Sequence, residues 1–139
     1  MKKAFTILEI IFTLIIISIL LVVAIPKLFN NLSNANIIKL KTDLVLIKSA
    51  INDYNQKQIY LNTNQLLEVL GNDENQLFNI ILDTPIVAQK NIAGNWSKQS
   101  LTIYNAWIDN TNSIKFEFDK IKQTFKCDTS KQYCKELLK

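Results

Sequence analysis

Residues 1–26 read MKKAFTILEIIFTLIIISILLVVAIP, and this segment sets the chain apart from an ordinary soluble domain. From Ala4 to Ile25, 18 of 22 residues are apolar. As a helix, this segment is about 33 Å long, enough to cross a hydrocarbon core of about 30 Å. Lys2 and Lys3 precede it, and the positive-inside preference places the N-terminus in the cytoplasm and the rest across the membrane. The sequence therefore predicts one N-terminal membrane-spanning helix.

Two general interpretations of this segment are open. A secretory signal peptide would use the small residues at Val22–Ala24 as its cleavage site, but its apolar run is usually only about 7–15 residues long and holds no acid. In a plain membrane anchor, Glu9 would only make insertion of the helix into the membrane less favourable. A charge costs about 2.5–3.5 kcal/mol at the centre of a spanning helix and less near its end, and such residues are usually functional.

A third interpretation accounts for the acid, because the segment resembles the leader of a type IV prepilin. In that family a dedicated peptidase cuts before the apolar run, here between Ala4 and Phe5, and N-methylates the new first residue, here Phe5. Glu9 then falls at the fifth mature position, where the family keeps a glutamate. Pro26 falls at the twenty-second, where the family commonly keeps a helix-kinking proline. Ala4 departs from the family, most of which has glycine there.

The resemblance also implies a role for Glu9 and a set of partners. A carboxylate in lipid must be neutralised or paired, and the resemblance implies a pair with the N-terminal amine of Phe5 in a neighbouring subunit. That pair would set the register of subunits in a filament. The alternative is a side chain that extends toward the cytoplasmic headgroups. The implied partners are other pilin-like subunits, the prepilin peptidase, and an assembly ATPase with its platform protein.

Beyond Pro26 the apolar residues recur every three or four positions, with charged residues mostly between them, as in an amphipathic helix. Pro26 removes one backbone hydrogen bond and is expected to kink the helix without ending it. We therefore expect one long kinked helix over about residues 5–55. The predicted organisation is a leader at 1–4, a membrane-spanning or filament-core helix at 5–26, and a periplasmic globular domain at 27–139.

The rest of the chain predicts two short helices and three strands. A helix over 65–70 would be capped by Asn64 and closed by Gly71, and a second would cover 77–82. Trp96 follows a turn and is expected in the core. Strands are expected over 101–108, 114–118 and 123–127, with a hairpin loop at 109–112. The predicted fold is α+β, a long N-terminal helix packed on a small antiparallel sheet, and this is also the architecture that the pilin resemblance implies.

The two cysteines, Cys127 and Cys134, lie near the C-terminal end of the sequence. In an oxidising compartment they can form a disulfide around an eight-residue loop, and two free buried thiols are the alternative. The spacing is not Cys-x-x-Cys, so a catalytic thiol pair is not indicated. Asp128 and its neighbours Thr129 and Ser130 offer oxygen ligands, but this is a weak calcium signal, and no metal site is predicted.

Composition argues against catalysis. The chain has no His, no Arg and only two Gly, which removes the usual general base, bidentate phosphate clamps and glycine-rich phosphate loops. We expect no enzyme activity and no cofactor. The segment from Lys115 to Lys139 contains seven lysines and four acidic residues. A solvated face is the first interpretation of this excess, and a weak DNA-contacting patch is the second.

The sequence thus predicts a pilin-like subunit of a type IV pilus or of a type II secretion or DNA-uptake pseudopilus. The subunit would be anchored in the bacterial inner membrane and would be assembled into a filament after processing. The alternative is an anchored or secreted periplasmic binding domain that forms no filament.

Overall fold

The computed structural model describes residues 6–63 and 65–139, and for 26–33 it describes the backbone alone. The predicted cleavage between Ala4 and Phe5, and the methylation of Phe5, lie outside the described residues. The chain divides into two compact units, Met1–Asn34 and Ala35–Lys139. One helix, α1 (Ile7–Tyr60), supplies residues to both.

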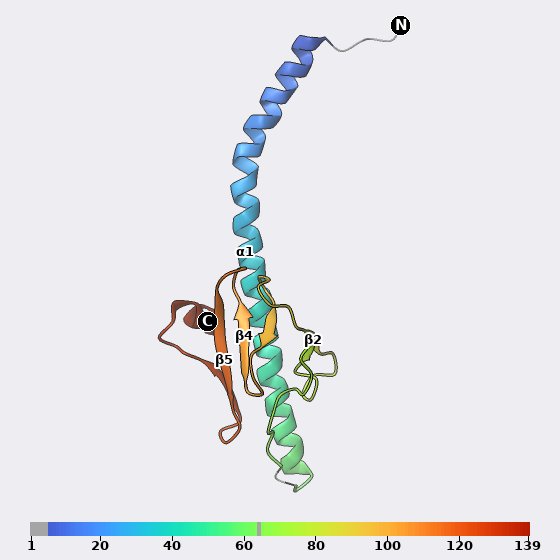
Figure 1. The fold of residues 1–139 in the computed structure, drawn as a ribbon, viewed down its shortest axis with the longest axis vertical. Coiled ribbons are helices and arrows are strands. Elements are labelled where there is room, and N and C mark those ends of the chain that lie inside the picture. The colour runs from blue at the N-terminus through green and yellow to red at the C-terminus, as the bar shows by residue number, and fades with distance from the viewer. Residues whose placement is uncertain (1–5, 64) are drawn as a thin grey trace. The chain divides into compact units, whose positions relative to one another are not determined.

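Helix α1 has 54 residues and confirms the predicted long helix, which ends five residues later than expected. It continues through Pro26. The predicted kink falls among residues 26–33, whose side chains lie outside the described part, so it stays a prediction. In the second unit, α1 buries Leu40, Leu44, Ile47 and Ile51. Their spacing of four, three and four residues places them on one face. That face packs against the sheet and joins the core of this unit (Figure 1).

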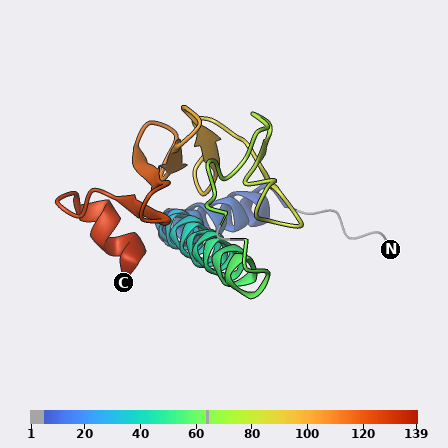
Figure 2. The same cartoon turned by 90° about the horizontal axis from the view of Figure 1, so that it is seen from below.

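The sheet has four antiparallel strands in sequence order: β3 (Trp96–Lys98), β4 (Ile103–Trp107), β5 (Ser113–Asp119) and β6 (Thr124–Cys127). Along β5, buried Ile114, Phe116 and Phe118 alternate with exposed polar residues, as expected for a strand with one face in a core. The sheet lies on one side of α1 (Figure 2). A separate two-stranded sheet pairs β1 (Gln76–Leu77) with β2 (Ile86–Val87). The α+β class and the three predicted strands are confirmed.

Aromatic rings fill the space between α1 and the sheet. Trp96 and Phe116 meet edge to face at 5.3 Å between ring centroids, and Phe116 stacks on Phe125 at 5.2 Å. Phe78 stacks on Tyr104 at 4.5 Å. All five side chains are buried, so Trp96 is a core residue as predicted. Such pairs contribute about 0.5–1.5 kcal/mol each beyond the area they bury.

The turn before β3 requires glycine. Gly94 has φ of +76°, and a Cβ there would lie 2.8 Å from Oδ1 of Asn36 on α1. The Gly94 N–H donates to the carbonyl of Trp107 at 2.8 Å, and its own carbonyl accepts from Nζ of Lys39 at 2.8 Å. A residue without a side chain therefore lets the turn lie close against the helix.

The two predicted short helices are wrong. Residues 65–70 form no helix, and Gln123 bonds the backbone there: its Oε1 accepts from the Leu67 N–H, and its Nε2 donates to the Leu67 carbonyl. In 77–82, Leu77 belongs to β1 and Phe78 has φ of +62°, which interrupts any helix. Leu67, Leu77 and Phe78 are buried by the tertiary core and not by one face of a helix. A C-terminal helix, α2 (Gln132–Leu138), was not predicted.

Candidate functional site

The described part of the first unit includes an apolar helical segment, Ile7–Ile25, in which no residue is buried. Over Ile7–Ile25, 19 residues have a mean hydropathy of 3.0 and none is covered by the chain itself. Nineteen helical residues extend about 28 Å, close to the hydrocarbon thickness of a bilayer. The segment is thus long and apolar enough to span a membrane. So large an exposed apolar surface indicates contact with lipid or with other proteins.

Glu9 lies in the first turn of this segment, and its side chain is exposed. Its backbone N–H donates to the carbonyl of Thr6 at 3.1 Å. The two other polar side chains on the segment are satisfied locally, because Thr13 donates to the Ile10 carbonyl at 2.8 Å and Ser18 to the Leu14 carbonyl at 2.7 Å. Within residues 6–63 and 65–139, no hydrogen bond or ion pair reaches the Glu9 carboxylate. Among the described residues, Glu9 is therefore the one polar side chain of this segment without a hydrogen-bond or ion-pair partner.

The cysteine pair belongs to the second unit. Cys127 ends β6 and Cys134 lies in α2, and the structure joins them by a disulfide with 6.0 Å between the Cα atoms. Both residues are buried. Between them, Oδ1 of Asp128 accepts the backbone N–H of Ser130 at 2.9 Å, which lowers the pKa of Asp128. The Asp128 carboxylate, which the sequence offers as a weak calcium ligand, thus closes a turn. The residues described contain no group of three or more acidic or cysteine side chains that could hold a metal.

Replacing both cysteines by serine is expected to lower the free energy of unfolding by about 2–3 kcal/mol, because an eight-residue loop is no longer closed in the unfolded chain. Urea denaturation of the oxidised protein and of the Cys127→Ser, Cys134→Ser variant measures this difference. Reduced wild-type protein is the control and should match the variant. An unchanged unfolding midpoint would show that the disulfide adds nothing to stability.

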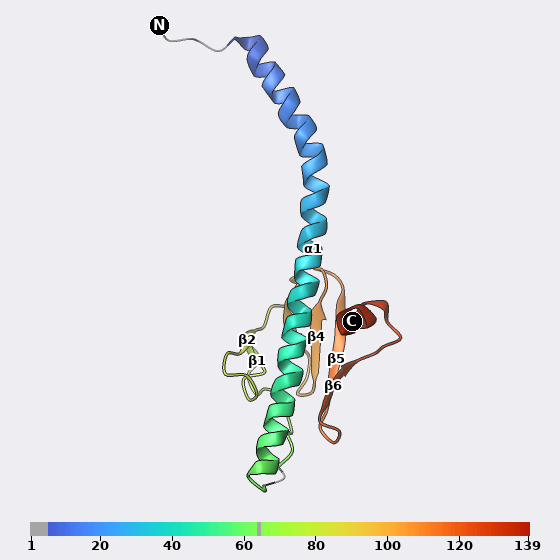
Figure 3. The same ribbon diagram turned by 180° about the vertical axis from the view of Figure 1, so that it is seen from behind.

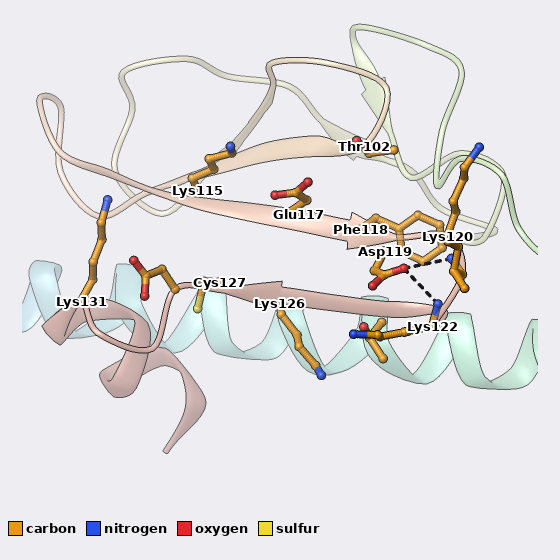
Figure 4. A pocket seen from close by; sticks show the side chains of 13 residues that line it. Thr102, Lys115, Glu117, Phe118, Asp119, Lys120, Lys122, Lys126, Cys127 and Lys131 are labelled. Carbon is orange, nitrogen blue, oxygen red and sulfur yellow. Dashed lines mark hydrogen bonds between the residues drawn. The ribbon is translucent and has the colours of Figure 1, made fainter.

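A groove of about 750 Å³ runs over the exposed face of β5 and β6. Five lysines and three acids line it: Lys115, Lys120, Lys122, Lys126, Lys131, Glu117, Asp119 and Asp128. Asp119 accepts the backbone N–H groups of Lys122 and Ile121, which lower its pKa (Figure 4). Lys120 forms an ion pair with Glu68 at 3.2 Å.

The lysines of this groove do not converge on one point. In the view of Figure 4, the side chains of Lys115 and Lys120 point upward and that of Lys126 points downward. The net excess is two charges, from five lysines and three acids. The arrangement matches a solvated charged face, and the DNA-contacting patch stays an expectation.

Asp43 joins α1 to the sheet, and no sequence pattern indicated this role. Its Oδ2 accepts the indole N–H of Trp96 at 3.1 Å. Burial raises the pKa of Asp43, against the lowering effects of the Trp96 hydrogen bond and of the charge on Lys39. Lys39 itself donates to Oδ1 of Asn95 at 2.6 Å. These polar contacts fix the helix against the start of β3.

The raised pKa of Asp43 sets a pH dependence of stability. Below the unfolded pKa of about 4 the carboxyl is neutral in both states, and above the folded pKa the folded state carries a half-buried charge. The Asp43 carboxyl therefore contributes less to the stability of the folded state as the pH rises from the unfolded pKa to the folded pKa. Asp43→Asn keeps a hydrogen-bond acceptor without the charge, so its stability relative to wild type should increase between pH 3.5 and pH 7. Urea titrations of both proteins at the two pH values measure the change, and a constant difference contradicts the assignment.

The predicted site residues fall into separate parts of the chain. Glu9 belongs to the first unit, and Cys127 and Cys134 to the second. Comparison of the chain with protein-family models, with curated proteins and with solved structures finds no match.

Proposed function

We propose that the chain is a pilin-like structural subunit that is processed at its N-terminus and assembled into a filament. The observation that carries the proposal is the exposed apolar helix Ile7–Ile25 with one carboxylate, Glu9, two residues after its start and without a partner among the described residues. A plain anchor needs no acid there, and a signal peptide needs neither the acid nor the full length. A helix that must later be packed among identical helices accounts for both features.

The second unit supports the same proposal. Helix α1 continues directly from the apolar segment into a face that packs on an antiparallel sheet. The α+β layout is compatible with the pilin architecture that the N-terminal motif implies. In this proposal the apolar segment serves first as an anchor in the inner membrane, with the domain of residues 35–139 in the periplasm. It serves later as the filament core.

The residues around Ala4 and Phe5 specify the processing step. A prepilin peptidase would hydrolyse the Ala4–Phe5 peptide bond and transfer a methyl group to the new amine. Removing residues 1–4 also removes two lysines, which lowers the net charge of the side chains from +4 to +2. The assembly ATPase and its platform protein are the further partners proposed.

Mass spectrometry of the mature N-terminus in the native host tests the proposal. N-methylated Phe5 is the expected first residue. A chain that starts at Ile25 would identify a signal peptide and a secreted binding domain, and an intact leader would identify a plain anchor. A variant with a bulky residue at the cleavage site, Ala4→Trp, is expected to stay uncut and unmethylated, while Ala4→Gly is the matched control that should be processed.

The filament system is proposed as a type IV pilus or a type II secretion or DNA-uptake pseudopilus. The soluble part is small for a major pilus subunit, which favours a minor or pseudopilus subunit. Deleting the coding sequence and measuring twitching, secretion and transformation in one strain shows which of the three activities needs this chain.

A further inference from the structure

A second groove, of about 280 Å³, lies between α1 and the outer edge of the sheet. One helix face and one strand end line it: Lys48, Ile51, Asn52, Asn55, Gln123, Thr124, Phe125 and Lys126. Its floor includes the apolar side chains of Ile51 and Phe125, which are 3% and 2% exposed. The groove is thus an apolar trough with polar walls.

The strand along this groove has a free edge. β6 is the last strand in the sheet order, on the side of the domain away from β1 and β2 (Figure 3). In the part of the chain that the structure describes, β6 pairs with β5 alone, and no other backbone hydrogen bond reaches residues 124–127. Residues of an antiparallel edge strand alternately direct their N–H and C=O groups outward. Some of the backbone groups of β6 are therefore available to a further strand.

Two lysines at the groove lack an acidic partner. Lys48 of α1 and Lys126 of β6 both line it, and among the described residues neither has an acid within 4.0 Å. Burial lowers the pKa of Lys48, and the charge of Lys126 lowers it further. Glu117 is opposite Lys126 in the strand register, but the two form no ion pair, and Lys126 points away from Lys115 and Lys120 (Figure 4). The groove carries an unbalanced positive charge.

An unpartnered acceptor lies at the same groove. Oδ1 of Asn55 is buried and accepts no hydrogen bond within residues 6–63 and 65–139. Buried polar atoms are nearly always paired, and a donor in the groove reaches this oxygen only if the Asn55 side chain turns toward it. A simple anion supplies only acceptors and leaves Asn55 unpaired. An extended peptide supplies N–H donors, backbone groups for the free edge, an apolar side chain for the trough and, where it is acidic, carboxylates for the two lysines.

We propose that this groove binds an extended, carboxylate-bearing peptide segment of another protein, which adds to the free edge of β6 as a fifth strand of the sheet. Main-chain hydrogen bonds would give the affinity of such strand addition, and the lysines would select the acidic partner. The proposal rests on the geometry of residues 48–55 and 123–126. It is independent of whether the chain assembles into a filament.

Binding to the full-length chain in detergent micelles tests the proposal. The probe is fluorescein-labelled Val-Glu-Val-Asp-Val, blocked at its C-terminus as the amide, and its amide counterpart Val-Gln-Val-Asn-Val is the comparison peptide. Fluorescence anisotropy should show at least about tenfold weaker binding of the counterpart, and of the acidic probe to the Lys48→Gln and Lys126→Gln variants. Lys57→Gln changes a lysine of the same helix that does not line the groove, and its binding should stay within about twofold.

Hydrogen exchange distinguishes strand addition from simple ion binding. The acidic probe should slow exchange at amides of residues 124–127, and the same peptide N-methylated at alternate residues should not. Both lysines are exposed, so the variants are expected to keep the wild-type urea midpoint. Equal binding of both peptides, or the same protection from succinate alone, overturns the proposal. Protection of residues 124–127 that rises with protein concentration and without peptide would assign the edge to a second copy of this chain instead.

Discussion

Replacing Trp96 by alanine is expected to lower the free energy of unfolding of the second unit by about 3–5 kcal/mol. The side chain is fully buried, and its ring lies 5.9 Å from Phe78 and 5.3 Å from Phe116 between centroids. The change opens a cavity in the centre of the aromatic core and leaves the Asp43 carboxylate without its indole donor. Because a domain of this size is stable by only about 5–15 kcal/mol, this one change removes a large fraction of its stability.

Urea denaturation followed by circular dichroism measures the effect of Trp96→Ala. Tyr133→Ala is the matched control, because this aromatic side chain is 45% exposed and its loss should cost less than about 0.5 kcal/mol. Trp96→Phe keeps a ring and removes the indole donor, so its stability should fall between wild type and Trp96→Ala. If Trp96→Ala were as stable as Tyr133→Ala, the assignment of Trp96 to the centre of the core would be wrong.

Glu9→Ala is expected to lower incorporation into filaments by about tenfold or more, under the proposed assembly. The variant removes the acid that would neutralise the amine of a neighbouring Phe5, and an unpaired charge among apolar helices is costly. A loss of about 1.4 kcal/mol per subunit contact already corresponds to tenfold. The measurement compares the amount of the protein in sheared filaments with the amount in the membrane fraction.

Membrane retention of Glu9→Ala should be unchanged, because the apolar segment keeps its length and gains an apolar residue. Thr13→Val is the matched control on the same helix, since the Thr13 hydroxyl bonds only the Ile10 carbonyl in its own turn. Wild-type incorporation of Glu9→Ala would mean that the carboxylate sets no register and extends toward the headgroups.

The parts of the fold that follow a simple period could be predicted from the sequence. Leu40, Leu44 and Ile47 repeat at helical spacing, and Ile114 and Phe116 alternate with polar residues, so one long helix and a central strand were expected. The burial of Trp96 followed from its size and from the turn before it. In these segments local pattern and tertiary burial agree.

Other segments depend on contacts from far along the chain. Leu67 receives its backbone hydrogen bonds from Gln123, 56 residues away, where a helix would have supplied them locally. Gly71 lies against Phe78, so that a Cβ there would be 2.8 Å from the Phe78 nitrogen, and this close approach replaces the helix cap expected at that glycine. Helix α2 has no side-chain cap at Lys131 and depends on the burial of Cys134 and Leu137. Local propensity alone could not have shown these outcomes.

The groove between α1 and β6 could not be predicted either. Lys48 and Lys126 are 78 positions apart, and each alone resembles any solvated lysine. They share a groove because the strand order places β6 at the sheet edge. Glu9 could be identified as a candidate site residue from the sequence because an acid within an apolar segment is unusual. A positive charge in a lysine-rich domain is not unusual.

The strand order also has a kinetic consequence. Each of β4, β5 and β6 pairs with the strand just before it, across a connection of four or five residues. Such a meander has low contact order and needs no later segment to begin folding. Helix α1, the surface on which it packs, precedes these strands in the chain and is made before them. The second unit can therefore fold in the order in which its residues leave the ribosome, and its closing step is the bond between Cys134 and Cys127.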